Sequence, residues 1–182
     1  MTAASAILPA HRPNALLAIF VGGLLAGSLD LGSAFIVYGA GVPRAIAGGV
    51  LGRGAFQGGV GTYALGIALH FFIAMSAAGV YYAASRKLAF LREHALICGL
   101  FYGIAVFLTM NLIVLPLSAL HSRGPYQLAG LIQGLLVHMF FIGLPISFSV
   151  RHFTKQHAGT RQKGTFWSEE PHTQSATSNA TR

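Results

Sequence analysis

Four long apolar runs dominate this sequence and limit what the chain can fold into. They cover residues 15–38, 62–85, 95–120 and 128–150. Each run is long enough for a helix to cross the roughly 30 Å of bilayer hydrocarbon at about 1.5 Å per residue. A helix is the only open-ended element that satisfies its backbone hydrogen bonds there. We therefore predict an all-α integral membrane protein, folded as an up-down bundle of four transmembrane helices.

Charged residues are scarce and gather outside these runs. They make up only 9% of the chain, about a third of the share in a soluble globular domain. The formal net charge is +8. No basic stripe is interleaved with aromatic residues, so we expect no nucleic-acid partner. The basic residues instead flank the runs, which predicts contacts with the lipid bilayer and with anionic lipid headgroups at its cytoplasmic face.

The positions of Lys and Arg beside the runs predict the orientation. Placing both termini in the cytoplasm gives eight basic residues inside and three outside, as the positive-inside rule favours. The inner residues are Arg12, Arg86, Lys87, Arg92, Arg151, Lys155, Arg161 and Lys163, and the outer ones are Arg44, Arg53 and Arg123. The first run exceeds a typical signal-peptide core, so we expect it to be retained. Cleavage near Ala26–Ser28 is the alternative.

Three segments flank or interrupt the predicted transmembrane domain, residues 15–150. Residues 1–14 form a short cytoplasmic N-terminus. Residues 39–61 are rich in glycine but still apolar, which fits either an interfacial or re-entrant segment or a plain outer loop. Residues 151–182 are polar and lack an apolar period, so we expect a disordered cytoplasmic tail.

Each run contains one strongly polar residue at a similar depth. Asp30, His70, Asn111 and His138 lie eight to ten residues from the predicted outer ends of their runs. That spacing puts all four in one slab, roughly 12–15 Å below the outer surface. An ionised carboxylate near mid-membrane costs about 2.5–3.5 kcal/mol even on insertion scales. We therefore expect Asp30 to be neutral, paired or hydrated inside the bundle.

Small residues four apart indicate which helix faces pack together, because they allow close approach in bilayers. The predicted packing residues are Gly22, Ala26, Gly66, Ala74, Gly99, Gly103, Gly130 and Gly134. These rows lead to the four polar positions. Two prolines, Pro116 and Pro145, remove a backbone hydrogen bond within the third and fourth runs and predict kinks there.

The polar layer leaves several functions open. Intramembrane ionisable residues often serve proton or ion pathways, and an Asp30–His70 or Asp30–His138 pair would titrate as a coupled unit. The alternative is hydrogen-bonded packing glue, in a structural or scaffold subunit of a membrane complex. Haem b held by His70 and His138 is a third alternative, and a metal site with Asp30 has no supporting ligand spacing. We predict no catalytic residues, and transport by four helices would require a homo-oligomer.

Three stretches carry a resemblance to a known group of proteins. They are Leu69–Ala74, Met110–Ser118 and Gly134–Met139. Over residues 15–150 the chain resembles small uncharacterised four-span inner-membrane proteins of Proteobacteria, and more distantly the YagU-like family. The resemblance implies a multi-pass protein of the bacterial inner membrane. It carries over only to His70, Asn111, Pro116 and His138 and implies little chemistry.

Overall fold

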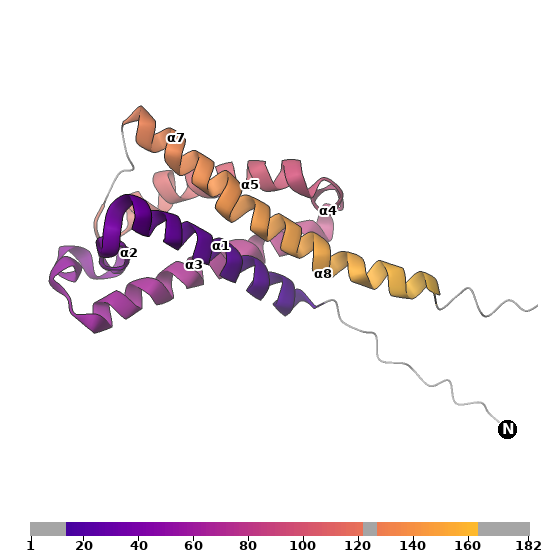
Figure 1. The fold of residues 1–182 in the computed structure, drawn as a ribbon, viewed down its shortest axis with the longest axis horizontal. Helices are drawn as coiled ribbons and strands as arrows, with labels where there is room; N and C mark the ends of the chain where they lie inside the picture. Colours follow the sequence, from indigo (N-terminus) through magenta and orange to yellow (C-terminus); the bar gives the residue numbers. More distant parts are fainter. Residues whose placement is uncertain (1–13, 122–126, 164–182) are drawn as a thin grey trace, which may run out of the picture.

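A computed structural model describes residues 14–121 and 127–163 of the chain (Figure 1). Within these ranges the regular structure is entirely helical, with no strand. Four helical stretches are long and apolar enough to cross a membrane, judged by length and composition: Ala15–Gln57, Val60–Lys87, Ala95–Leu117 and Leu128–Thr154. The prediction of four membrane-length helices in an all-α protein is therefore confirmed for the described residues.

The elements follow the predicted runs closely. Most of the chain lies in α1, α3, the α5–α6 stretch and the α7–α8 stretch. In chain order the elements are α1 (Ala15–Tyr38), η1 (Gly39–Gly41), α2 (Val42–Leu51), η2 (Gly52–Gln57), α3 (Val60–Lys87), α4 (Phe90–Glu93), α5 (Ala95–Thr109), η3 (Met110–Val114), α6 (Leu115–Leu117), α7 (Leu128–Val137), η4 (His138–Gly143) and α8 (Leu144–Lys163). Figure 1 shows α2 at one end of the molecule and α4 near the other; we name these the α2 end and the α4 end.

The glycine-rich segment after α1 is helical, so the plain-loop alternative is wrong. Two short 3₁₀ turns flank α2, and Gly39 and Gly52 adopt φ of 75° and 72° at the junctions. Only glycine takes such backbone angles without strain. These two residues break the helix and let α2 fold back against α3, which favours the interfacial or re-entrant alternative.

Specific contacts fix α2 at its end of the molecule. Arg44 donates from Nε to the carbonyl oxygen of Gly58 at 2.9 Å, and its guanidinium carbon lies 5.7 Å from the centre of the Tyr63 ring. The amide of Ala119 donates to the carbonyl of Gly49 at 2.8 Å. The segment is thus tied both to the beginning of α3 and to the chain after α6.

Each of the two prolines follows a π-helical segment. η3 and η4 are π-helical, and each ends two residues before a proline, Pro116 and Pro145 respectively. A proline ring clashes with the carbonyl four residues earlier in a regular α-helix. The wider π turn relieves that clash, and π segments occur often at functional sites. The predicted kinks are therefore accompanied by a local change of helix type.

The last helix extends beyond the predicted boundary. We expected the fourth span to end at Val150 and the tail to follow, but α8 continues as helix to Lys163. The rest of the predicted tail, residues 164–182, and most of the predicted N-terminus, residues 1–13, lie outside the described residues.

α1 packs between two neighbours. It contacts α3 on one side and α8 on the other, while α5 packs against η4 and α8. The core lies toward the α4 end, where Ala18, Ala78, Ile146 and Val150 are fully buried. The four polar residues predicted to form one layer lie outside this hydrophobic core, nearer the α2 end.

The predicted small residues sit mostly at these helix contacts. A Cβ on Gly22 would lie 3.1 Å from the Ser149 side chain, and Gly99 and Gly103 lie against η4 and α8. Gly66 lies against the Pro43 backbone of α2, and Gly134 against Phe107. Ala26 and Ala74 are buried. The small-residue faces proposed for a scaffold are thus used largely within this chain.

Candidate functional site

Asp30 and His70 face each other across the contact between α1 and α3. Oδ2 of Asp30 lies 4.0 Å from Nε2 of His70, and the two side chains are 19% and 13% exposed. This separation is longer than a direct hydrogen bond and lies at the limit for an ion pair, which would form only with a protonated imidazole. The structure therefore brings together the one acidic residue within the apolar runs and one of the two predicted histidines.

The same imidazole nitrogen is anchored to the backbone of α1. Nε2 of His70 lies 2.8 Å from the carbonyl oxygen of Gly27. A carbonyl only accepts, so Nε2 must carry the proton and donate it. Gly27 permits this approach, because a Cβ at that position would lie 2.9 Å from the Phe71 ring. The hydrogen bond fixes the ring one helical turn from Asp30.

The other two predicted residues bond within their own helices. Nδ1 of His138 donates to the carbonyl of Gly134 at 2.9 Å, and Nδ2 of Asn111 donates to the carbonyl of Phe107 at 2.9 Å. The Phe107 ring packs edge-on against His138, with ring centres 5.4 Å apart. Because Nδ1 of His138 carries the proton in the bond to Gly134, the other ring nitrogen, Nε2, is unprotonated in the neutral ring and can accept a hydrogen bond.

Two adjoining cavities connect these four side chains into one region. The smaller cavity, about 90 Å³, is lined by Asp30, His70 and His138 together with apolar residues. The larger, about 200 Å³, is lined by Asp30, Asn111, Gln133 and His138 and reaches Tyr38 at the end of α1. Asp30 and His138 line both cavities, so the predicted layer is a contiguous polar region that extends toward the α2 end.

An aromatic pair closes this region toward the α4 end. Ala77 lines the smaller cavity, and its carbonyl accepts a hydrogen bond of 2.6 Å from the Tyr102 hydroxyl. The Tyr102 and Tyr81 rings pack edge to face at 4.9 Å, and the Tyr81 hydroxyl donates to Leu91 at 2.9 Å. Tyr81 is 1% exposed, and Ile146 and Val150 beyond it are fully buried. A hydrophobic core that includes Tyr81, Ile146 and Val150 therefore lies on the α4 side of the smaller cavity.

The site does not have the shape of a metal or haem site. Among the side chains described in residues 14–121 and 127–154, no three His, Cys, Asp or Glu gather as metal ligands. The cavity that His70 and His138 share has room for only a few waters, because each water takes roughly 30 Å³. A porphyrin is far larger than that, so the haem alternative has no geometric support.

The structure adds residues that the sequence reasoning missed. Gly27 orients His70, and Gln133 and Tyr38 line the larger cavity. Gln133 is a polar residue in an apolar run, and that signal was available. Nothing in the sequence distinguished Gly27 from the other small residues of α1, because the contact depends on how α3 crosses it.

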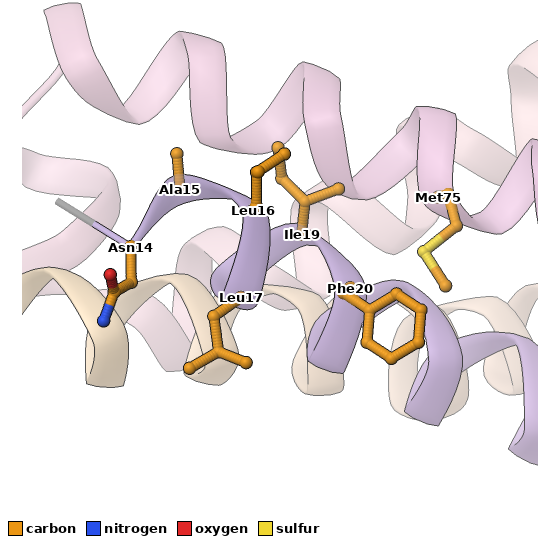
Figure 2. Close-up of a pocket in the computed structure, with 7 residues that line it drawn as sticks. All are labelled: Asn14, Ala15, Leu16, Leu17, Ile19, Phe20 and Met75. Carbon is orange, nitrogen blue, oxygen red and sulfur yellow. The ribbon is translucent and has the colours of Figure 1, made fainter. Parts of the chain in front are cut away.

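A more voluminous hollow than these two cavities lies away from the polar layer. It is an apolar groove of about 870 Å³ beside the first two turns of α1, lined by Leu16, Ile19 and Phe20, with Asn14 at its end and Met75 from α3 (Figure 2). Leu16 and Phe20 are 84% and 57% exposed. An exposed apolar groove on a membrane-length helix is suited to contact with lipid tails.

Comparison with protein-family models, curated proteins and solved structures gives no match for this chain. The interpretation of the site therefore rests on its own geometry.

Proposed function

We propose that this chain is a multi-pass protein of a bacterial inner membrane, with both termini in the cytoplasm and the α2 end facing outward. Four membrane-length apolar helices support the membrane location. Arg86, Lys87 and Arg92 gather at the α4 end, whereas Arg44 and Arg53 lie at the α2 end. The excess of basic residues among those flanking the helices supports a cytoplasmic α4 end.

We further propose that the Asp30–His70 pair binds protons arriving from the outer side and serves as a proton-sensing site. The observation that carries this proposal is the pair of adjoining cavities that share Asp30 and His138 as lining residues. Water in the larger cavity would carry protons between the outer end and Asp30. The Asp30 carboxylate and the His70 imidazole lie 4.0 Å apart, so a proton bound by one group lies close to the other.

Sensing is favoured over conduction by the closed half of the molecule. The Tyr81–Tyr102 pair and the buried residues behind it separate the smaller cavity from the α4 end. A proton held at Asp30 therefore has an exit only toward the side from which it came. Protonation would change the electrostatic balance between α1 and α3 without a net proton current.

One property of the sequence makes the proposal directly testable. Asp30 is the only aspartate in the chain. Protein labelled with ¹³C at the aspartate carboxyl will give one resonance that needs no assignment. We expect this resonance to move when the pH of the sample is changed. We also expect His70→Gln to move its midpoint.

His94→Gln is the matched control, because His94 is an exposed histidine just before α5 and lines neither of the two polar cavities. This variant should leave the Asp30 midpoint where it is in the wild type. An Asp30 resonance that stays constant over the whole range, or that responds equally to the two histidine variants, would leave packing as the role of the layer.

A further inference from the structure

A further pocket lies at the α4 end, apart from the two polar cavities and from the groove beside α1. It measures about 560 Å³ and is lined by α3, α4 and α5, with Tyr81 and Tyr102 at one wall and Cys98 beside them. Its volume falls in the range of ligand-binding pockets, about 300–1,000 Å³. Phe90 and Phe101 line it as well and are 50% and 68% exposed. In a membrane their exposed rings would face lipid, so the pocket opens sideways into the bilayer.

Apart from the imidazole of His94, the residues that line the pocket offer its occupant almost no hydrogen bonds. The two tyrosine hydroxyls are already used, because Tyr81 donates to Leu91 and Tyr102 donates to Ala77. Sγ of Cys98 is directed at the carbonyl of Phe90 at 3.8 Å. A polar group placed here would lose its hydration without replacement. The part of the occupant inside the pocket is therefore hydrocarbon.

The shape of the aromatic wall favours a flexible chain over a flat ring system. Tyr81 and Tyr102 meet at an interplanar angle of 62°, so these two rings present no parallel faces between which a planar molecule would stack. A lipid acyl chain follows such an irregular wall by changing its own torsion angles.

A cluster of basic residues adjoins the pocket. Arg86 and Lys87 end α3, two and three residues after the pocket residue Ala84, and α4 carries Arg92 next to the pocket residue Leu91, with Glu93 as the one acidic residue between α3 and α5. Each cation near an anionic leaflet favours binding by about 1 kcal/mol, or about fivefold in affinity. The charge at the mouth thus complements a negatively charged lipid headgroup.

We propose that the pocket between α3, α4 and α5 binds one acyl chain of an anionic phospholipid, whose headgroup is held by Arg86, Lys87 and Arg92. The charge pattern of the sequence predicts contact with anionic lipid headgroups, and the proposed site says where on the protein one such lipid binds. It does not depend on the proton-binding role of Asp30, which lies in separate cavities.

The test uses fluorescence quenching by brominated lipids. Trp167 is the only tryptophan in the chain, so full-length protein with Trp167→Phe and Phe101→Trp carries a single reporter at the pocket mouth. The protein is reconstituted in vesicles in which either phosphatidylglycerol or phosphatidylcholine is brominated, at equal mole fractions. We expect the site to prefer phosphatidylglycerol by roughly fivefold or more.

Two changes should each abolish that preference. Changing Arg86, Lys87 and Arg92 together to Gln removes the headgroup contacts. Ala84→Leu fills the pocket and leaves the charges in place, and Ala83→Leu is its control, because Ala83 is exposed and does not line the pocket. A Phe20→Trp reporter in the groove of Figure 2 should be quenched equally by both lipids.

The other outcomes count against the site. Equal quenching of the Phe101→Trp reporter by the two lipids would mean ordinary contact with surrounding lipid and would overturn the proposal. A preference that the Gln variants abolish but Ala84→Leu leaves intact would also overturn it, since the headgroup would then bind without the acyl pocket. Circular dichroism of each variant confirms that the helices are retained.

Discussion

Nε2 of His70 lies 4.0 Å from Oδ2 of Asp30 while it donates a hydrogen bond to Gly27 on the same helix as that carboxylate. The backbone bond holds the imidazole in place without using the aspartate. The carboxylate is therefore left to interact with water and with protons in the two cavities that it lines. The His70–Gly27 hydrogen bond itself joins α3 to α1, as packing glue would, whereas the Asp30 carboxylate takes no part in that bond.

The close approach at Gly27 is the first feature to test. Gly27→Ala would bring a Cβ to 2.9 Å from the Phe71 ring, so we expect α3 to be pushed outward and the protein to lose about 1–3 kcal/mol of stability. Gly32→Ala is the control on the same helix, because no atom lies within 4 Å of a Cβ there. That variant should be neutral or slightly more stable. Reversible unfolding in mixed micelles measures both, and similar losses would contradict the account.

The hydroxyl of Tyr102 should contribute to the closure between α3 and α5. Tyr102→Phe keeps the ring but removes the bond to Ala77, and we expect a loss of about 1–2 kcal/mol. Tyr82→Phe is the comparison, since Tyr82 is buried nearby and its hydroxyl makes no hydrogen bond within the described part of the chain. Its effect should stay below about 0.5 kcal/mol. Equal unfolding midpoints for the two variants would argue against a structural role for the bond.

Removing the whole Tyr102 ring should convert a closed site into a leak. Tyr102→Ala takes away half of the aromatic pair that lies between the smaller cavity and the α4 end. In proteoliposomes with a trapped pH dye, we expect the wild type to pass protons no faster than empty vesicles and Tyr102→Ala to pass them faster. Adding Asp30→Asn should slow that leak. A wild type that conducts protons by itself would show that the aromatic pair is no barrier.

The π-helical segments should control how the polar residues are presented. In Pro145→Ala the clash that favours η4 is gone, so the segment can return to regular α-helix and His138 rotates relative to the cavities. We expect the Asp30 carboxyl titration to shift. Pro116→Ala is the counterpart at η3, where the affected polar side chain, Asn111, does not titrate, and a smaller shift is expected. A titration unchanged by Pro145→Ala would exclude His138 from the coupled site.

The orientation is checked by reporter fusions. A fluorescent protein fused after Ser85 should be bright, because we place that end of α3 in the cytoplasm, whereas alkaline phosphatase fused after Gln127 should be active on the outer side. An active phosphatase after Ser85 would reverse the proposed orientation and with it the side from which protons reach Asp30.

The helix positions could be predicted from sequence because length and apolarity alone set them. The predicted runs agree with α1 and with the apolar part of α3 to within a few residues. The polar layer was also predictable, since one strongly polar residue per run at matching depth is unusual in apolar helices. The structure places all four residues on two adjoining cavities.

Other features depend on packing that a single sequence does not reveal. α1 has small residues on two faces: Gly22 lies against α8, and Gly27 lies against α3. The four-residue spacing picked out only the first face. The glycines of residues 39–61 left a plain loop open beside an interfacial or re-entrant segment, although Gly39 and Gly52 act only at the junctions of the helix α2. The polar part of α8 that continues to Lys163 has no regular spacing of apolar residues, so the sequence pattern did not predict a helix there.

We propose that Asp30 exchanges protons with the outer side alone. The most direct measurement follows its single ¹³C-labelled carboxyl resonance in sealed proteoliposomes of uniform orientation, while the pH is changed on one side at a time. The account predicts that the resonance moves when the compartment at the α2 end is acidified and stays constant when only the compartment at the α4 end is acidified. A resonance that follows the α4 side, or that ignores both, would contradict it.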